Sequence, residues 1–270
     1  MCVVADDFGL HPAVDEAVVQ LVAQGRVNAV SVMAAAPAWP RDAAMLREVA
    51  GDRADVGLHL DLTAFPVQAA LRQPLPRWIA ASLLRAVDGR AIEREIQEQL
   101  WRFEQAWGGP PDHVDGHQHV HQLPVVRERL VAVLNQRYPG RQPWLRSTRQ
   151  PRVPGAGMAA AFKPWVIESL GARALAHLAR RHGIAQNGRL LGVYGFEGDA
   201  VRYLQRLQGW LSLAQPGDLL MCHPAVAEVP GDDIAAARVA EFQALSSAAV
   251  PALLQLAGVS LGRLRGVTVS

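Results

Sequence analysis

The sequence predicts an α/β fold, an irregular (β/α) barrel of about seven parallel strands with its site at the carboxyl ends of the strands. Short β-branched runs alternate with helical patterns along the chain, which is typical of a parallel sheet wrapped by helices. No linker divides the 270 residues into two compositions, and no internal repeat is evident. Because α/β barrels reach about 250 residues as one unit, we expect a single domain over residues 1–270.

The first half of the chain contributes four strands and four helices. The strand 2–5 leads into a helix over 11–25, where Pro12 suits a first helical turn and Gly25 ends the pattern. The apolar periodicity then predicts strands at 28–34, 54–63 and 112–117 and helices at 41–50, 91–108 and 124–137. Residues 64–90, with three prolines, interrupt the series as an irregular insertion.

The second half continues the alternation after a loop. We expect strands at 143–147, 189–195, 217–225 and 263–269, and helices at 163–182, 200–213 and 233–256. Residues 149–161, "RQPRVPGAGMAAA", have loop composition and could form a lid over a site.

Composition excludes several classes of protein. Lys and Arg number 27 against 25 Asp and Glu and are scattered, so no basic stripe with aromatics indicates nucleic acid. No uncharged run reaches the ~18 residues of a membrane span, and the N-terminus lacks the pattern of a signal peptide. The two cysteines, Cys2 and Cys222, do not form a disulfide framework, so a cytoplasmic location is the default and Cys222 is expected to be a small buried residue.

Titratable residues gather where predicted strands end. Any one of them is explained by a helix cap or a hydrogen-bonded core histidine. Caps and core histidines do not explain why five strand ends carry such residues. Because the carboxyl ends of parallel strands meet at one edge of a sheet, these residues are expected to converge there. The residues are Asp6, Asp7, His59, the histidines of "DGHQHVH", Arg146 and His223.

The segment "DGHQHVH" is the strongest local signal. Asp115, His117, His119 and His121 occupy alternate positions, so an extended chain would point all four to one side. A helical pairing of His117 with His121, as in zinc proteases, is disfavoured because no Glu adjoins His117 and Pro124 places the helix later.

An Asp with two His around one divalent ion is a recurring hydrolytic arrangement, in which bound water reaches a pKa near ~7. Such a site also needs a base, and Asp6 beside Asp7 can supply it. Adjacent strand residues normally face opposite ways. Both acids therefore reach one site only if the chain turns, and we expect that turn at Phe8 and Gly9.

Four motifs, in order, resemble the YdjC/ChbG/HpnK group of carbohydrate deacetylases: "ADDFGLHPAVDEAV", "VGLHLDLT", "HVDGHQHVHQLP" and "MCHPA". The resemblance spans nearly the whole chain. It implies a metal-dependent hydrolase on an irregular (β/α) barrel, related to the polysaccharide deacetylases. Such an enzyme would remove acetyl from an N-acetylated sugar, releasing acetate by attack of metal-bound water, and the resemblance also suggests a homodimer.

Residue roles follow from the resemblance by position. Asp7, His59 and His117 match the ligands of one divalent ion, Mg²⁺ or Zn²⁺. Asp6 matches the acid that deprotonates water, and His223 matches the proton donor to the leaving amine. The remaining motif positions are expected to bind substrate or to support the ligands, and they are Asp115, His119, His121 and Arg146.

Two alternative functions are less consistent with these residues. A barrel metallophosphoesterase or amidohydrolase also gathers His and Asp at strand ends, but amidohydrolases close the first strand with His-x-His, where this chain has Asp6 and Asp7. A sugar-binding protein without turnover would not need an acid and a base beside a metal. The diverged middle of the chain leaves the sugar open, and mixed oxygen and nitrogen ligation leaves the metal open.

Overall fold

A computed structural model describes residues 1–151 and 158–265, and there seven parallel strands form one sheet. The strand order is β5-β4-β3-β2-β1-β7-β6, with β1 (Cys2–Phe8) towards the middle. The other strands are β2 (Ala29–Val32), β3 (Asp55–Leu60), β4 (His113–Gly116), β5 (Trp144–Leu145), β6 (Leu190–Leu191) and β7 (Leu219–Cys222). The predicted α/β fold of about seven parallel strands is confirmed.

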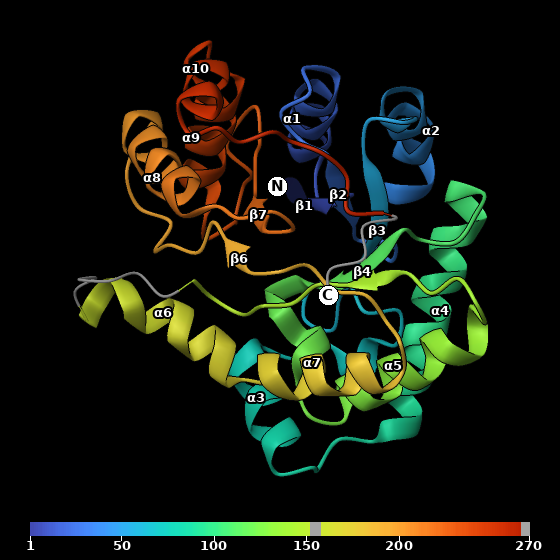
Figure 1. Ribbon diagram of the computed structural model, residues 1–270. Helices are drawn as coiled ribbons and strands as arrows, with labels where there is room; N and C mark the ends of the chain where they lie inside the picture. The colour runs from blue at the N-terminus through green and yellow to red at the C-terminus, as the bar shows by residue number, and fades with distance from the viewer. Residues whose placement is uncertain (152–157, 266–270) are drawn as a thin grey trace.

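Irregular backbone brings the two edges of the sheet together. The N–H of Leu145, in β5, donates to the carbonyl of Ala185 over 2.9 Å. The N–H of Leu190, in β6, donates to the carbonyl of Arg149 over 2.7 Å. The sheet is therefore curled into an irregular barrel, with helices on its outside (Figure 1).

Most helices follow their strands as the periodicity predicts. In α1 (Pro12–Ala23) the buried Val14, Val18 and Leu21 share one face, and His11 Nδ1 accepts the Ala13 N–H over 3.1 Å as a cap. The helices α1 and α2 (Trp39–Ala50) lie on the same side of the barrel as α8 (Ala200–Leu213), α9 (Ala235–Ser246) and α10 (Ala249–Leu256) (Figure 1). Further helices are α4 (Gly89–Trp107), α5 (Val126–Arg137) and α7 (Ala172–Arg181).

The insertion at 64–90 is more regular than its prolines suggest. It holds a short 3-10 helix, η1 (Ala69–Leu71), and the helix α3 (Leu75–Leu83), and α4 begins before it ends. Pro76 lies in the first turn of α3, where the missing N–H costs nothing. Trp78 is buried and donates its indole N–H to the carbonyl of Leu62 over 2.9 Å, which anchors α3.

Two predicted long helices are each broken in two. The first divides into α6 (Met158–Ser169) and α7 at Gly171, which has φ 154° and whose added Cβ would lie 2.1 Å from the Gln122 carbonyl. The second divides into α9 and α10 (Ala249–Leu256), because Ser247 is extended and its hydroxyl accepts the Ala249 N–H over 3.1 Å. Among the described residues no single helix could cross a membrane, and α9 with α10 reaches the required length and hydropathy only as a pair bent by 72°.

Two further predictions reach segments at the limits of the described chain. In the expected lid at 149–161, residues 152–157 lie outside the described residues and α6 already begins at Met158. In the expected last strand, residues 263–265 are not a strand and 266–269 lie outside the described residues.

Aromatic packing and buried thiols fill the interior around β1. Trp39 is fully buried, stacks on Phe103 at 5.6 Å between ring centroids and meets Phe8 edge-on at 6.2 Å. Cys2 and Cys222 are buried free thiols, so Cys222 is the small buried residue that was expected.

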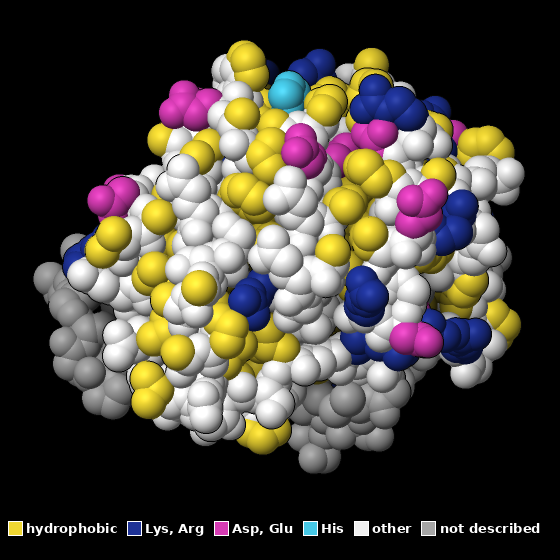
Figure 2. All heavy atoms as spheres, turned by 90° about the horizontal axis from the view of Figure 1, so that it is seen from above, with side chains coloured by type: hydrophobic (Ala, Val, Ile, Leu, Met, Phe, Trp, Pro, Cys, Tyr) yellow, Lys and Arg dark blue, Asp and Glu magenta, His cyan; other side chains and the backbone are white. Residues whose placement is uncertain are grey.

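On the face shown in Figure 2, Lys and Arg side chains are interspersed with Asp and Glu rather than joined into a basic surface.

The strand interior at Gly57 has no room for a side chain. A Cβ there would lie 2.4 Å from the ring of His113 in the neighbouring strand. We expect Gly57→Ala to lower the free energy of unfolding in urea by about 1–3 kcal/mol, because the buried ring must shift. Gly209→Ala is the control: its Cβ meets nothing within 4 Å in α8, so it should be neutral or stabilise by about 0.5–1 kcal/mol. Equal stability of the two variants would contradict this account.

Candidate metal centre and active site

A bulge in β1 brings both acids to the same side. The register of β1 against β2 shifts between Ala5 and Phe8, and Asp7 has φ 67°, in the left-handed region. The extra residue cancels the alternation of a strand, so Asp6 and Asp7 both approach His59. The expected turn at Phe8 and Gly9 is present, since the Leu10 N–H donates to the Asp7 carbonyl over 3.0 Å and Gly9 has φ 95°. The bulge at Asp7, which was not predicted, is what brings the two acids to one side.

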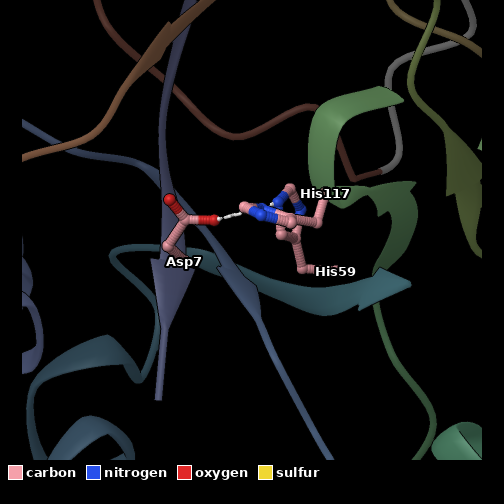
Figure 3. A group of neighbouring side chains, drawn as sticks. All are labelled: Asp7, His59 and His117. Carbon is pink, nitrogen blue, oxygen red and sulfur yellow. Dashed lines mark hydrogen bonds and ion pairs between the residues drawn. The ribbon is translucent and has the colours of Figure 1, made fainter. Parts of the chain in front are cut away.

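The three predicted ligands converge from three elements. Asp7 lies on β1, His59 on β3, and His117 on the 3-10 helix η2 (His117–Gln122). One nitrogen or oxygen of each lies within 4.8 Å of the others. Asp7 Oδ1 is 2.8 Å from His117 Nδ1 and 3.3 Å from His59 Nε2, and both rings point toward that oxygen (Figure 3).

The ring of His59 is oriented by a carboxylate behind it. Its Nδ1 donates to Asp115 Oδ1 over 2.6 Å, which turns Nε2 toward Asp7. Such a pairing is the usual support of a metal-binding histidine. Burial opposes protonation of this ring, yet Asp115 and Asp6 raise the pKa of His59 to about 10.

The donor set fits a divalent ion. One carboxylate oxygen and two imidazole nitrogens suit Zn²⁺ and related ions and leave positions for water and substrate. The ligand atoms of a second group, Asp6, His59 and Asp115, also lie within 4.8 Å of one another. There, however, the guanidinium of Arg146 already pairs with both carboxylates. We therefore assign the candidate metal centre to Asp7, His59 and His117, which together form the ligand group.

Arg146, just after β5, fixes Asp6. The guanidinium is fully buried and donates from Nη1 and Nη2 to the two oxygens of Asp6 over 2.7 and 2.6 Å. Burial opposes its charge, but Asp115 and Asp6 hold the pKa of Arg146 above its usual value. Asp6 is thus a carboxylate held in one orientation by a paired cation, as a general base must be.

His223 follows β7 and faces the same carboxylate. Its Nε2 lies 3.8 Å from Asp6 Oδ2, and its backbone N–H donates to Glu241 Oε2 over 2.5 Å. Phe196 packs edge-on against the ring at 5.3 Å between centroids. Burial lowers the pKa of His223 to about 4, so the imidazole is neutral at pH 7 in the absence of substrate.

The segment "DGHQHVH" is not extended throughout, so the prediction of alternate side chains on one face is wrong. The strand β4 ends at Gly116, and η2 then curls back through Gln118 (φ 52°) and His119 (φ 62°). Within this segment His117 alone belongs to the ligand group, while His121 Nε2 donates to the Arg146 carbonyl over 3.0 Å. His119 Nδ1 is buried with no partner among the described residues, and burial and Arg146 hold the pKa of His119 well below its usual value.

Four residues of the site escaped the sequence analysis. Ser31 donates to Asp115 Oδ2 over 2.6 Å, and His113 Nε2 lies 2.9 Å from the Ser31 hydroxyl. From α9, Arg238 pairs with Asp7 and Glu241 accepts the His223 N–H. The available signals are weak: a serine inside the apolar strand "AVSV", and two charges three residues apart on an alanine-rich helix.

Loss of the Arg146 guanidinium should be costly, because Asp6 and Asp115 would remain buried without their partner. We expect Arg146→Met to lower the free energy of unfolding by about 3–5 kcal/mol in urea titrations. Arg102→Met is the control: Arg102 and Glu98 are 40% and 41% exposed, and losing that pair should cost ~0.5 kcal/mol or less. A similar small loss in both variants would show that the buried network does not depend on Arg146.

Comparison with known proteins identifies the family of the chain. The YdjC-like protein family matches residues 1–256. A carbohydrate deacetylase of Mus musculus is 31% identical over 259 residues, covering 85% of this chain and 79% of the mouse protein. A chitooligosaccharide deacetylase of Serratia marcescens is 32% identical over 132 residues, 45% of this chain and 50% of its own. A crystal structure from Enterococcus faecalis, named for a proposed cleavage of cellobiose phosphate, shares the fold with TM-score 0.69 and 21% identity, covering 97% of this chain and 96% of that chain. The chain belongs to the YdjC-like family.

Proposed function

We propose that the protein is a metal-dependent deacetylase that removes the acetyl group from an N-acetylated sugar. The observation that supports this most is the bulged end of β1. It places Asp7 in the ligand group and Asp6 between Arg146 and His223. The deacetylase names of the mouse and Serratia relatives support the same activity.

One divalent ion, Mg²⁺ or Zn²⁺, would be held by Asp7, His59 and His117. When bound, it supplies polarisation of the amide carbonyl and a lowered pKa for the attacking water. The chain's own residues then have to orient the water, take its proton and protonate the leaving group. Asp115 contributes by holding the His59 ring in place.

Asp6 and His223 would divide the proton transfers. Asp6 takes a proton as the water oxygen bonds to the acetyl carbon, and Arg146 holds the carboxylate in position. The C–N bond breaks only when the nitrogen is protonated, since an amine anion is a poor leaving group. His223 is neutral at rest and 3.8 Å from Asp6, so it can receive the proton from Asp6 and pass it to that nitrogen. Acetate and the free amino sugar result.

The remaining motif residues take supporting roles in this proposal. His121 donates to the Arg146 carbonyl and so helps to hold that backbone in place. His119, whose Nδ1 has no partner in the part of the chain that the structure describes, would contact the substrate. A cytoplasmic location and a homodimer stay predictions, the first from composition and the second from the family resemblance.

The activity is tested directly by acetate release from a panel of N-acetylated sugars and oligosaccharides, with and without a chelator. We expect release from at least one member, loss of release after chelation, and recovery when a divalent ion is added back. Turnover of phosphate esters alone would favour the metallophosphoesterase instead. Sugar binding without any turnover would favour a binding protein.

The role of Asp6 is tested by Asp6→Asn. The variant keeps Asp7, His59 and His117, so bound metal measured by elemental analysis should be unchanged. The rate constant kcat for acetate release should fall by roughly 10²–10⁴-fold, because the general base is lost. Full activity in this variant would overturn the assignment.

His117→Ala tests the ligand group. Removing one of three protein ligands should abolish stoichiometric metal binding, while the half-buried position leaves folding intact by circular dichroism. Gln118→Ala changes an exposed neighbour in the same turn and is the matched control. Unchanged metal content in His117→Ala would refute this ligand.

A further inference from the structure

Arg238 reaches the metal centre from a helix that the motifs do not include. It lies on α9, its side chain is 2% exposed, and its Nη2 donates to Asp7 Oδ2 over 2.7 Å. Its Nε pairs with Asp232, so the guanidinium is held from two sides. The contact with Asp7 spans 231 positions of sequence and joins the last third of the chain to its first strand.

The two acids of β1 are each paired with an arginine, but in different ways. Arg146 donates hydrogen bonds to both oxygens of Asp6. Arg238 donates only to Oδ2 of Asp7, while Oδ1 faces His59 and His117. The oxygen that belongs to the ligand group is therefore the one that the guanidinium does not touch.

The position of Arg238 is set by its backbone as well as by its side chain. Its carbonyl accepts the N–H of Ala225 over 3.1 Å, two residues after His223. One turn further along α9, Glu241 accepts the N–H of His223. The same face of α9 thus contacts both the ligand Asp7 and the segment of the proposed proton donor.

We propose that Arg238 is a positioning residue that keeps Asp7 a ligand through one oxygen only. By occupying Oδ2, it prevents the carboxylate from chelating the ion and so preserves coordination positions for the water and the acetyl carbonyl. This inference rests on the proposed function, because it presumes that Asp7, His59 and His117 bind a divalent ion.

The test is X-ray absorption of the zinc-loaded protein, comparing wild type with Arg238→Met. Methionine fills similar space without a donor, so Oδ2 of Asp7 becomes free to bind. We expect the zinc shell of Arg238→Met to gain about one oxygen, and kcat to fall roughly 10- to 100-fold with little change in KM. Arg238→Lys keeps a cation that can pair with Oδ2, and it should retain the wild-type zinc shell.

Arg189→Met is the matched control. Arg189 also pairs with a buried carboxylate, Asp218, which is 2% exposed, but the pair lies at the amino ends of β6 and β7. This variant should lose stability without any change in the zinc shell. A merely structural role of Arg238 would make Arg238→Met behave in the same way.

A second measurement covers the case in which Arg238→Met does not fold. In wild-type protein labelled with ¹⁵N-arginine, the Arg238 guanidinium signal is assigned by its absence from Arg238→Lys. It should remain in slow exchange with water after zinc is added, because Oδ2 stays its partner. Loss of that protection on zinc loading would overturn the proposal.

The outcomes separate this inference from the proposed function. If the wild-type protein bound no divalent ion, both would fail. If it bound zinc and released acetate while Arg238→Met kept the wild-type zinc shell, the positioning role of Arg238 alone would be refuted. If Arg238→Lys showed the same zinc shell as Arg238→Met, the positioning role would also be refuted, because a cation at this position would then have no effect on how Asp7 binds zinc.

Discussion

The left-handed backbone of Asp7 is the constraint on which the site depends. A regular strand would direct Asp6 and Asp7 to opposite faces, and only one could meet His59. The bulge turns both carboxylates to the same side at the end of β1. A non-glycine residue in this conformation costs about 1–3 kcal/mol and persists only where its surroundings hold it. Here those surroundings are His59, His117 and Arg238, which all contact the Asp7 carboxylate.

Charge balance explains why so many polar groups can be buried together. Asp6, Asp7 and Asp115 are all nearly inaccessible, and an unpaired buried carboxylate is strongly unfavourable. Arg146 bridges Asp6 and Asp115, and Arg238 pairs with Asp7. Each pairing also fixes the orientation of a carboxylate. The network that makes burial tolerable therefore also directs Asp7 toward His59 and His117 and Asp6 toward His223.

The sequence predicted the fold and several of the residues that converge, because alternating strands and helices and polar strand ends are visible as patterns. It missed the features that depend on single backbone angles. The turn at Asp7 and the curl through Gln118 and His119 use left-handed non-glycine residues, which no periodicity encodes. The breaks at Gly171 and Ser247 interrupt otherwise continuous helical patterns.

Arg238 and Glu241 were missed for a different reason. On an alanine-rich helix they look like solvent-facing charges, and their burial arises only because α9 packs over the carboxyl ends of β1 and β7. The ligand and proton-transfer assignments themselves stay predictions, supported by the convergence of their residues.

The most direct test of the account is to locate the ion by anomalous diffraction at the zinc edge, in crystals grown with zinc. The account predicts one anomalous peak within about 2.0–2.2 Å of Asp7 Oδ1 and of a nitrogen of both His59 and His117, with Asp6 outside the coordination shell. A peak bound by Asp6 and Asp115, or none near these residues, would contradict it.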